Sequence, residues 1–162
     1  MTSLLAFVIT VSDRSASGER ADRGGPLAVS LLEESGIERV ASEIVPDGAD
    51  SVEQALRRAL ATGARLIVTT GGTGVGPRDQ TPEGTQRVVT RPLPGIAEEL
   101  RRVGLADTPL SVLSRGIAGV ADPEGALIVN LPGSPRAVSS GIPVIVSVAT
   151  HVVDQVKGGD HS

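Results

Sequence analysis

The fold of this chain depends on the stretch VTTGGTGVGPRDQTPE, residues 68–83, where an apolar run ends in a glycine-rich loop. The apolar run indicates a buried strand, and the closing Thr-Pro-Glu is a typical helix start with proline at the first helical position. Glycines let backbone amides approach an anion closely, so this loop can bind phosphate. The residues concerned are Gly71, Gly72, Thr73 and Gly74, with the threonine as a hydroxyl donor. A tight turn between strand and helix explains the same glycines equally well.

Strand and helix patterns alternate on both sides of this stretch. Apolar runs rich in β-branched residues predict strands at residues 4–11, 66–70 and 126–131. Residues 40–45 mix apolar and polar positions before a Pro-Asp-Gly turn, which predicts a further strand. Apolar residues at helical spacing predict helices that begin near Gly24, Ser51, Thr81, Ile96 and Ser134, and the polar residues 14–22 predict a surface loop. Residues 142–156 have the β-branched content of a strand, but their length and apolar spacing suit a buried helix, which we favour. This alternation predicts an α/β protein with a mostly parallel central sheet.

One domain is the simplest organisation for 162 residues that contain no convincing repeat or linker. We assign this domain to residues 1–157 and expect a loose tail at 158–162. The chain has no cysteine, which excludes disulfides, thiolate metal sites and a cysteine nucleophile. No basic leader precedes the first apolar run, and no run is long enough to span a bilayer. We therefore expect a cytoplasmic protein without a membrane segment.

Charged and aromatic residues argue against several other classes of function. The formal net charge is −4 and Phe7 is the only aromatic residue, so we expect neither a basic face nor a stacking platform for nucleic acid. Lys157 is the only lysine, which excludes a lysine-dependent Walker loop at the glycine stretch. No Gly-x-Gly-x-x-Gly follows the first strand, and no Ser-His-Asp set is apparent. His151 lies among apolar residues, which favours a packed core or interface position over a catalytic base.

Several polar side chains follow the predicted strands. Ligands of open parallel sheets bind beyond the carboxyl ends of the strands, so these side chains should share one rim. The rim would hold Ser12, Asp13, Asp47, the glycine loop and residues 132–134. Asp47 and Asp79 can converge there, and their oxygens suit Mg²⁺, which also binds substrate phosphates. Taken alone, Asp47 also fits a turn residue, and Asp79 fits an Asx cap or a partner of Arg78.

Ser114 and Arg115 form a small polar island between apolar segments. With no His or Lys base nearby in sequence, Ser114 is interpreted as a hydrogen-bond donor to a phosphate or substrate, and a turn serine is the alternative. For Arg78 and Arg115, substrate contact and solvated surface charge are both open. The predicted substrate-binding residues are Ser12, Asp13, Gly71, Gly72, Thr73, Gly74, Arg78, Ser114, Arg115, Pro132, Gly133 and Ser134.

Three of these segments together resemble a known family. TGGTG at 70–74, RDQTPE at 78–83 and LPGSP at 131–135 resemble the molybdopterin adenylyltransferase family of molybdenum cofactor biosynthesis. TVSDR at 10–14 and LSR at 113–115 are similar to further landmarks of the family, so the resemblance covers nearly the whole chain. The same fold occurs in the G domain of gephyrin and in the molybdopterin-binding domain of molybdenum insertion enzymes.

The resemblance implies a fold, a reaction and partners. The implied fold is a three-layer α/β/α sandwich of the molybdopterin-binding type, in a homotrimer for which the molybdenum insertion enzyme is an expected partner. The implied reaction uses Mg-ATP to adenylylate the terminal phosphate of molybdopterin and releases pyrophosphate. On this analogy Asp47 and Asp79 are catalytic, metal-associated carboxylates, while Thr73 and Ser114 contact substrate. A non-catalytic pterin-binding or carrier homologue is the alternative, followed by a trimeric scaffold.

Two positions depart from the pattern of this family. DRGGP at 22–26 has Gly24 where many relatives have a serine, and Gly104 replaces a serine that some relatives have near the pterin site. Both aspartates are present, so the departures bear on pterin binding and not on the catalytic carboxylates.

Overall fold

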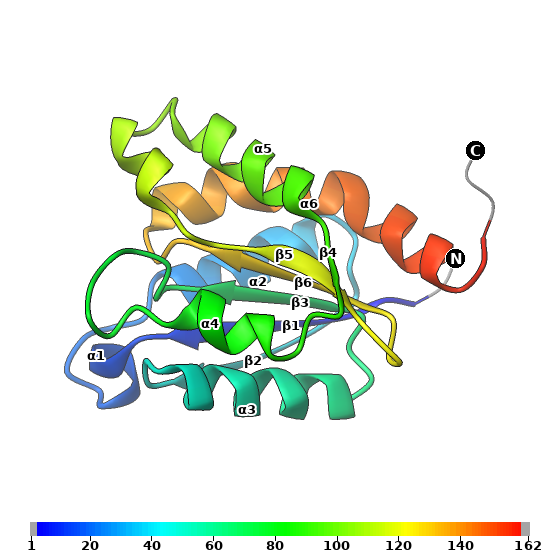
Figure 1. The fold of residues 1–162 in the computed structure, drawn as a ribbon, viewed down its shortest axis with the longest axis horizontal. Helices are drawn as coiled ribbons and strands as arrows, with labels where there is room; N and C mark the ends of the chain where they lie inside the picture. The colour runs from blue at the N-terminus through cyan, green and yellow to red at the C-terminus, as the bar shows by residue number, and fades with distance from the viewer. Residues whose placement is uncertain (1–2, 160–162) are drawn as a thin grey trace.

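The computed structural model describes residues 3–159 and contains a six-stranded sheet between two layers of helices (Figure 1). The strands, in the order β2-β1-β3-β6-β5-β4, are β1 (Leu5–Val11), β2 (Arg39–Val45), β3 (Leu66–Thr70), β4 (Arg91–Pro92), β5 (Ala118–Ala121) and β6 (Ala126–Leu131). The first four strands of this order are parallel, and β5 is antiparallel to both of its neighbours. The predicted mostly parallel sheet is therefore confirmed.

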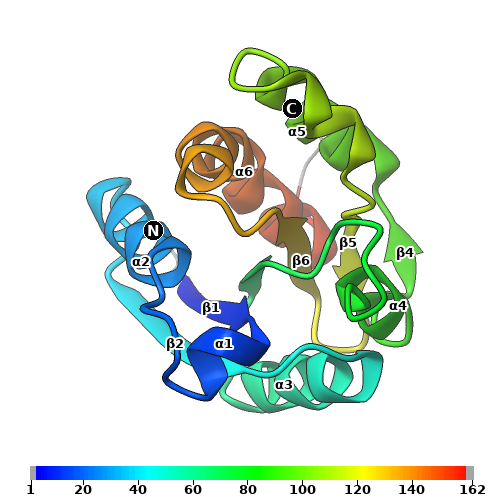
Figure 2. The ribbon, with the colours of Figure 1, turned by 90° about the vertical axis from the view of Figure 1, so that its left-hand side faces the viewer.

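The helices divide between the two faces of the sheet (Figures 1 and 2). One face carries α2 (Gly24–Glu34), α5 (Pro94–Gly104) and α6 (Pro135–Val156), and the other carries α3 (Ala49–Ala61) and α4 (Thr81–Gln86). Two short elements, α1 (Asp13–Ala16) and the 3₁₀ helix η1 (Pro109–Leu113), belong to connecting segments. This arrangement confirms the three-layer sandwich that the family resemblance implies.

Strand β1 shows why the sheet is covered on both sides. Successive side chains of a strand point to opposite faces, so its continuous apolar run contributes to two cores. Phe7 and Ile9 pack in a core that includes the apolar side of α3, whereas Ala6 and Val8 pack in a core that includes α2 and α6. A strand buried on both faces has no polar alternation, as expected for the centre of an α/β sheet.

Helix α6 confirms the prediction of a helix over residues 142–156. It is also long and apolar enough, by length and composition alone, to cross a membrane, so the expectation that no run reaches that length was wrong. In this fold α6 packs against α2, α5 and β6, with Ile142 and Ile145 buried. His151 lies on the exposed side of α6, 2.8 Å from the Gln155 amide, so the predicted core position was wrong, and an interface position stays a prediction.

The remaining differences from the sequence prediction are short elements. The predicted surface loop at 14–22 begins inside α1, because the Ser12 hydroxyl accepts a hydrogen bond from the Ser15 amide and caps one helical turn. Gly158 and Gly159, the first two residues of the predicted tail, donate to carbonyls of the last turn of α6. The rest of that tail, with His161, lies outside the described residues.

Candidate functional site

The carboxyl ends of the central strands meet at one rim, which Figure 2 views face on. In the strand register Thr10 of β1 lies beside Thr70 of β3, and Thr70 lies beside Leu131 of β6. The chain leaves β1 toward β2 through α2 and returns to β3 through α3 on the opposite face. Ligands of open α/β sheets bind at such a switch point, and the loops that follow these three strands therefore form the candidate site.

Most of the predicted site residues line one cavity of about 610 Å³ at this rim. They are Gly71, Gly72, Thr73, Gly74, Asp79, Ser114, Pro132, Gly133 and Ser134. The cavity also has an apolar wall that the sequence did not reveal, formed by Val75, Leu110 and Leu113. It therefore joins hydroxyls, backbone amides and a carboxylate to a surface suited to a flat, partly apolar ligand.

A second cavity of about 560 Å³ adjoins the first along the rim. It includes Ser12 and the charged residues Arg20, Asp22 and Arg23, and it shares Gly71, Gly133 and Ser134 with the large cavity. Because the two cavities share these lining residues, a ligand with more than one part can contact both.

The glycine loop has a conformation that other residues would strain. Gly71 and Gly72 have φ angles of +102° and +69°, in the region that favours glycine. A Cβ at Gly71 would meet the carbonyl oxygen of Val11, and a Cβ at Gly72 would meet the Thr81 hydroxyl. That hydroxyl donates to the Gly71 carbonyl at 2.8 Å, so α4 holds the start of the loop in place.

Asp13, Asp47 and Arg78 form a closed set of hydrogen bonds beside this loop. The amide of Asp13 donates to Asp47 Oδ2 at 2.9 Å, and the amide of Asp47 donates to Asp13 Oδ1 at 3.0 Å. Arg78 donates from Nε and Nη2 to the Asp13 carboxylate at 3.1 Å each, and from Nη2 to the Asp47 carbonyl at 2.9 Å. The Arg78 guanidinium accordingly lowers the pKa of Asp13. Asp13 and Arg78, both predicted substrate ligands, line neither cavity. The structure pairs them with each other instead.

Asp47 and Asp79 lie against successive glycines of the loop. Asp47 Oδ1 is 3.2 Å from the position of a Cβ at Gly72, and Asp79 Oδ2 is 2.9 Å from that of a Cβ at Gly74. Burial raises the pKa of Asp47; the Asp13 amide opposes the shift, and the charges of Asp13 and Asp79 increase it. A cation at this position would relieve that excess of negative charge. Both carboxylates therefore lie beside the glycine loop, but only Asp79 lines the large cavity, and their catalytic and metal-binding roles stay predictions.

The oxygen ligands that Asp47 and Asp79 offer fit a metal ion that needs few ligands from the protein. Within residues 3–159, no three His, Cys, Asp or Glu side chains are grouped so that they could hold a metal. Asp47 and Asp79 offer hard oxygens, and Asp79 Oδ2 also accepts from the Gly76 amide at 2.9 Å. Mg²⁺ commonly takes one or two carboxylates and completes its shell with water and substrate phosphates.

The raised pKa of Asp47 predicts an increase in stability when the residue is made neutral. In the unfolded chain the Asp47 carboxyl has a pKa near its ordinary value of 3.8, and in the folded protein its pKa is higher. Above the pKa of the folded state, ionised Asp47 therefore opposes folding. Below the pKa of the unfolded state the carboxyl is protonated in both states and has no effect on stability. Asp47→Asn should therefore raise the free energy of unfolding at pH 7, and the gain should vanish near pH 3.

Urea unfolding at the two pH values measures this effect. Asp13→Asn is the matched control with the opposite sign, because the pKa of Asp13 is lowered in the folded state and its ionisation favours folding at pH 7. An Asp47→Asn protein that is less stable than the wild type at pH 7 would contradict the expected sign.

The hydroxyls of the site differ in their surroundings. Thr73 is 4% exposed and lines the large cavity. The Ser114 hydroxyl accepts from the Gly116 amide at 3.3 Å and also faces that cavity. Ser134 caps α6 by accepting from the Ala137 amide at 3.2 Å. Each can still donate its own hydroxyl proton to a ligand.

The two glycines that depart from the family pattern each lie against another hydroxyl. A Cβ at Gly24 would come within 3.0 Å of Thr70 Oγ1, and a Cβ at Gly104 would meet the side chain of Ser111. Ser111 and Gly104 both line the large cavity. This chain therefore retains a hydroxyl close to each place where relatives have a serine.

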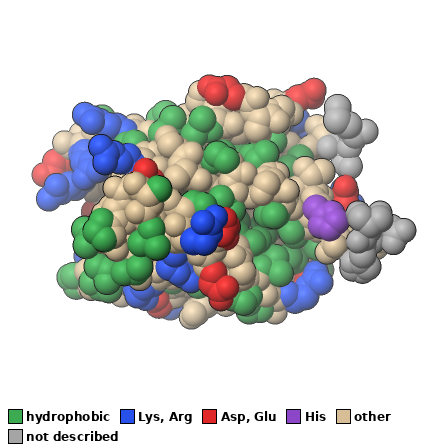
Figure 3. Space-filling model, turned by 90° about the horizontal axis from the view of Figure 1, so that it is seen from above, with side chains coloured by type: hydrophobic (Ala, Val, Ile, Leu, Met, Phe, Trp, Pro, Cys, Tyr) green, Lys and Arg blue, Asp and Glu red, His purple; other side chains and the backbone are tan. Residues whose placement is uncertain are grey.

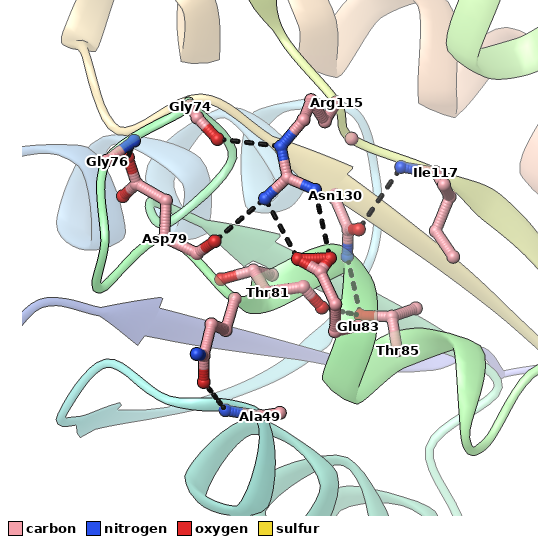
Figure 4. A network of polar contacts seen from close by, with 12 residues as sticks. Ala49, Gly74, Gly76, Asp79, Thr81, Glu83, Thr85, Arg115, Ile117 and Asn130 are labelled. Carbon is pink, nitrogen blue, oxygen red and sulfur yellow. Dashed lines mark hydrogen bonds and ion pairs between the residues drawn. The ribbon is translucent and has the colours of Figure 1, made fainter.

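Sequence reasoning missed two residues that connect the site. Asn130, in β6, is buried, and its Nδ2 donates to the Thr69 and Thr85 hydroxyls at 3.0 Å each. Its Oδ1 accepts from the Ile117 amide at 3.2 Å, and Figure 4 shows Asn130 with Ile117 and Thr85. Arg101 donates from Nη1 to the carbonyls of Ser114 and Gly116. The only sequence signal for Asn130 was a lone asparagine within an apolar strand. The helical spacing of Arg101 predicted a charged side chain on the outer face of its helix.

Replacing Asn130 should destabilise the protein without changing its surface. Asn130→Ala leaves the Ile117 amide without its acceptor and removes the donors to two threonine hydroxyls, and we expect a loss of about 2–3 kcal/mol in the free energy of unfolding. Urea denaturation measures this loss. Thr150→Ala, an exposed change on α6, is the control and should stay within about 0.5 kcal/mol of the wild type. Equal stabilities of the two variants would show that the Asn130 bonds contribute nothing.

Comparison with known proteins identifies the family of this chain. The family model described as "Probable molybdopterin binding domain" matches residues 7–151. The chain is 40% identical over 161 residues to a molybdenum cofactor biosynthesis bifunctional protein of Synechococcus elongatus, covering 99% of this chain and 50% of that protein. The chain thus spans about half the length of this relative. It is 39% identical to a molybdopterin adenylyltransferase of Haemophilus influenzae, covering 85% of this chain and 71% of that enzyme.

A solved structure gives the same result for the fold. The molybdopterin biosynthesis Mog protein of Mycobacterium ulcerans superposes with a TM-score of 0.89 at 44% sequence identity, covering 98% of this chain and 99% of that one.

Proposed function

Because the chain belongs to the probable molybdopterin binding domain family, we propose that it is a molybdopterin adenylyltransferase of molybdenum cofactor biosynthesis, with Mg-ATP as co-substrate. The observation that carries the proposal is the large cavity at the rim, where the glycine loop and Asp79 face an apolar wall. Three relatives described as molybdopterin adenylyltransferases, at 34–39% identity, support the choice of reaction.

The proposed reaction moves AMP from ATP to the pterin. A terminal phosphate oxygen of molybdopterin attacks the α-phosphorus of ATP, a new P–O bond forms, and the bond to the β-phosphate oxygen breaks to release pyrophosphate. Amides of the glycine loop and the hydroxyls of Thr73 and Ser114 bind phosphate oxygens. Leu110 and Leu113 exclude water from one side of the bound pterin.

Asp47 and Asp79 would hold Mg²⁺ beside the phosphates. The ion supplies charge neutralisation for the phosphate oxygens as negative charge moves to the leaving pyrophosphate. Arg78 fixes the neighbouring Asp13 and the backbone of Asp47, so the Asp47 carboxylate stays next to Gly72. Positioning of this kind is the main contribution that a protein makes to phosphoryl transfer.

We also propose that residues 1–157 form one domain of a cytoplasmic homotrimer that delivers its product to a molybdenum insertion enzyme. Exposed apolar side chains outside the cavity support an assembly, and the larger ones include Ile44, Leu105 and Val112. Figure 3 shows hydrophobic side chains grouped on the face that α5 and α6 form. Light scattering with size-exclusion chromatography measures the mass, and a monomer at micromolar concentration would contradict the trimer.

The test of the reaction is direct. Purified protein with molybdopterin, ATP and Mg²⁺ should accumulate adenylylated pterin and pyrophosphate in equal amounts. The alternative of a pterin-binding or carrier protein predicts saturable pterin binding with no pyrophosphate, and this result would overturn the proposed activity. Omission of Mg²⁺ with a chelator should abolish product formation if the metal takes part.

A further inference from the structure

Arg115 uses most of its donors on protein acceptors, although it directly follows Ser114 at the wall of the large cavity. Nε donates to the Gly74 carbonyl at 2.8 Å, and Nη2 donates to the Asp79 carbonyl at 2.7 Å (Figure 4). Nη1 and Nη2 each donate to one carboxylate oxygen of Glu83 at 2.9 Å. Four of the five guanidinium N–H groups are thus occupied, which leaves little for a ligand.

The carbonyls that Arg115 binds lie at the two ends of one loop segment, residues 74–79. Inside this segment the Asp79 amide donates to the Gly76 carbonyl at 3.1 Å, and the Gly76 amide donates to Asp79 Oδ2 at 2.9 Å. The segment contains no helix or strand, and glycine gives its backbone many alternative conformations. Bonds from outside the segment are therefore needed to keep the Asp79 carboxylate in one direction.

Glu83 and the backbone amide of Arg115 hold the Arg115 guanidinium in place against residues 74–79. Glu83 belongs to α4, whose neighbouring residues Thr81, Pro82 and Gly84 are buried, and Arg115 lowers the pKa of its carboxyl. The Arg115 amide donates to the Thr73 carbonyl at 2.8 Å, which joins the Ser114 wall to the glycine loop. A planar guanidinium sets the directions of all these bonds at once, which a lysine ammonium does not.

We infer that Arg115, braced by Glu83, is a positioning residue that holds residues 74–79 so that the Asp79 carboxylate faces the large cavity. The inference rests on the proposed function for the role of Asp79, but the conformation of the loop is measurable without any reaction. It replaces the sequence-based prediction that Arg115 contacts substrate.

Arg115→Lys tests the conformational part in the protein alone. Backbone amide order parameters from NMR relaxation should fall for residues 74–79 from about 0.85 to below about 0.6, while those of β3 stay unchanged. Arg102→Lys is the matched control, because Arg102 makes a bidentate pair with Glu99 on the exposed side of α5, at 2.8 and 2.6 Å. Wild-type order parameters in Arg115→Lys would overturn the inference.

The catalytic part is tested through the metal dependence. Arg115→Lys should raise the Mg²⁺ concentration for half-maximal transfer by about 10- to 100-fold, as changes in groups that orient metal ligands commonly do, with little change in the KM for molybdopterin. Arg102→Lys should leave both values as they are. A mobile loop with an unchanged Mg²⁺ dependence would overturn the positioning of Asp79.

Two further results separate the inference from the proposed function. A wild-type protein that transfers no AMP refutes the function, whereas the order parameters still decide whether Arg115 holds the loop. If Arg115→Lys does not fold, the same order parameters are measured on Glu83→Gln, because this change keeps the shape of the Glu83 side chain and removes the negative charge that pairs with Arg115. Its order parameters should fall in the same segment by a smaller amount, and unchanged values would overturn the inference.

Discussion

Asp79→Asn should reduce adenylyl transfer by about 100- to 1,000-fold with the fold intact. The loss has the size expected when one preorganised charged group is removed from a site of phosphoryl transfer. Asparagine retains an oxygen that accepts from the Gly76 amide, so the loop keeps its internal bond. The rate of pyrophosphate release at saturating ATP and Mg²⁺ measures the effect.

Asp154→Asn is the control for Asp79→Asn. Asp154 is an exposed carboxylate near the C-terminal end of α6, away from the rim, and its replacement should leave the rate unchanged. Circular dichroism and urea unfolding establish that both variants fold. Transfer by Asp79→Asn at the wild-type rate would show that this carboxylate takes no part in the reaction.

Gly71→Ala should lower the free energy of unfolding by about 3–5 kcal/mol. About 1–2 kcal/mol of this comes from a residue with a side chain at a φ of +102°. The rest comes from the contact of the new Cβ with the Val11 carbonyl, a backbone atom in the central sheet that cannot move without disturbing strand pairing. The same displacement should distort the loop that lines both cavities and remove transfer activity.

Gly63→Ala separates the two contributions at Gly71. Gly63 has a φ of +90° but no atom lies within 4 Å of the position that a Cβ would take. We therefore expect only the conformational cost of about 1–2 kcal/mol, with normal activity. Urea unfolding of both variants gives the difference, and equal losses would mean that the sheet accommodates the new methyl group at Gly71.

The parts of the site that depend on strand ends could be predicted from the sequence. Ser12, Asp47 and the two loops at 71–74 and 132–134 all follow predicted strands, and parallel pairing aligns the ends of those strands. The apolar wall could not be predicted in this way, because Leu110 and Leu113 lie in a 3₁₀ helix without a regular pattern. Short elements of this kind are held by tertiary contacts, and local propensity specifies them weakly.

The sequence by itself determined the layers of this protein and the glycine loop, because periodicity and backbone freedom are local properties of the chain. Only the tertiary structure decided which charged side chains remain available to a ligand. Arg78 pairs with Asp13, 65 positions away, and Arg115 pairs with Glu83, 32 positions away. Such partners are set by how the loops meet once the strands have paired, and this is why two arginines predicted as substrate ligands donate to protein acceptors instead.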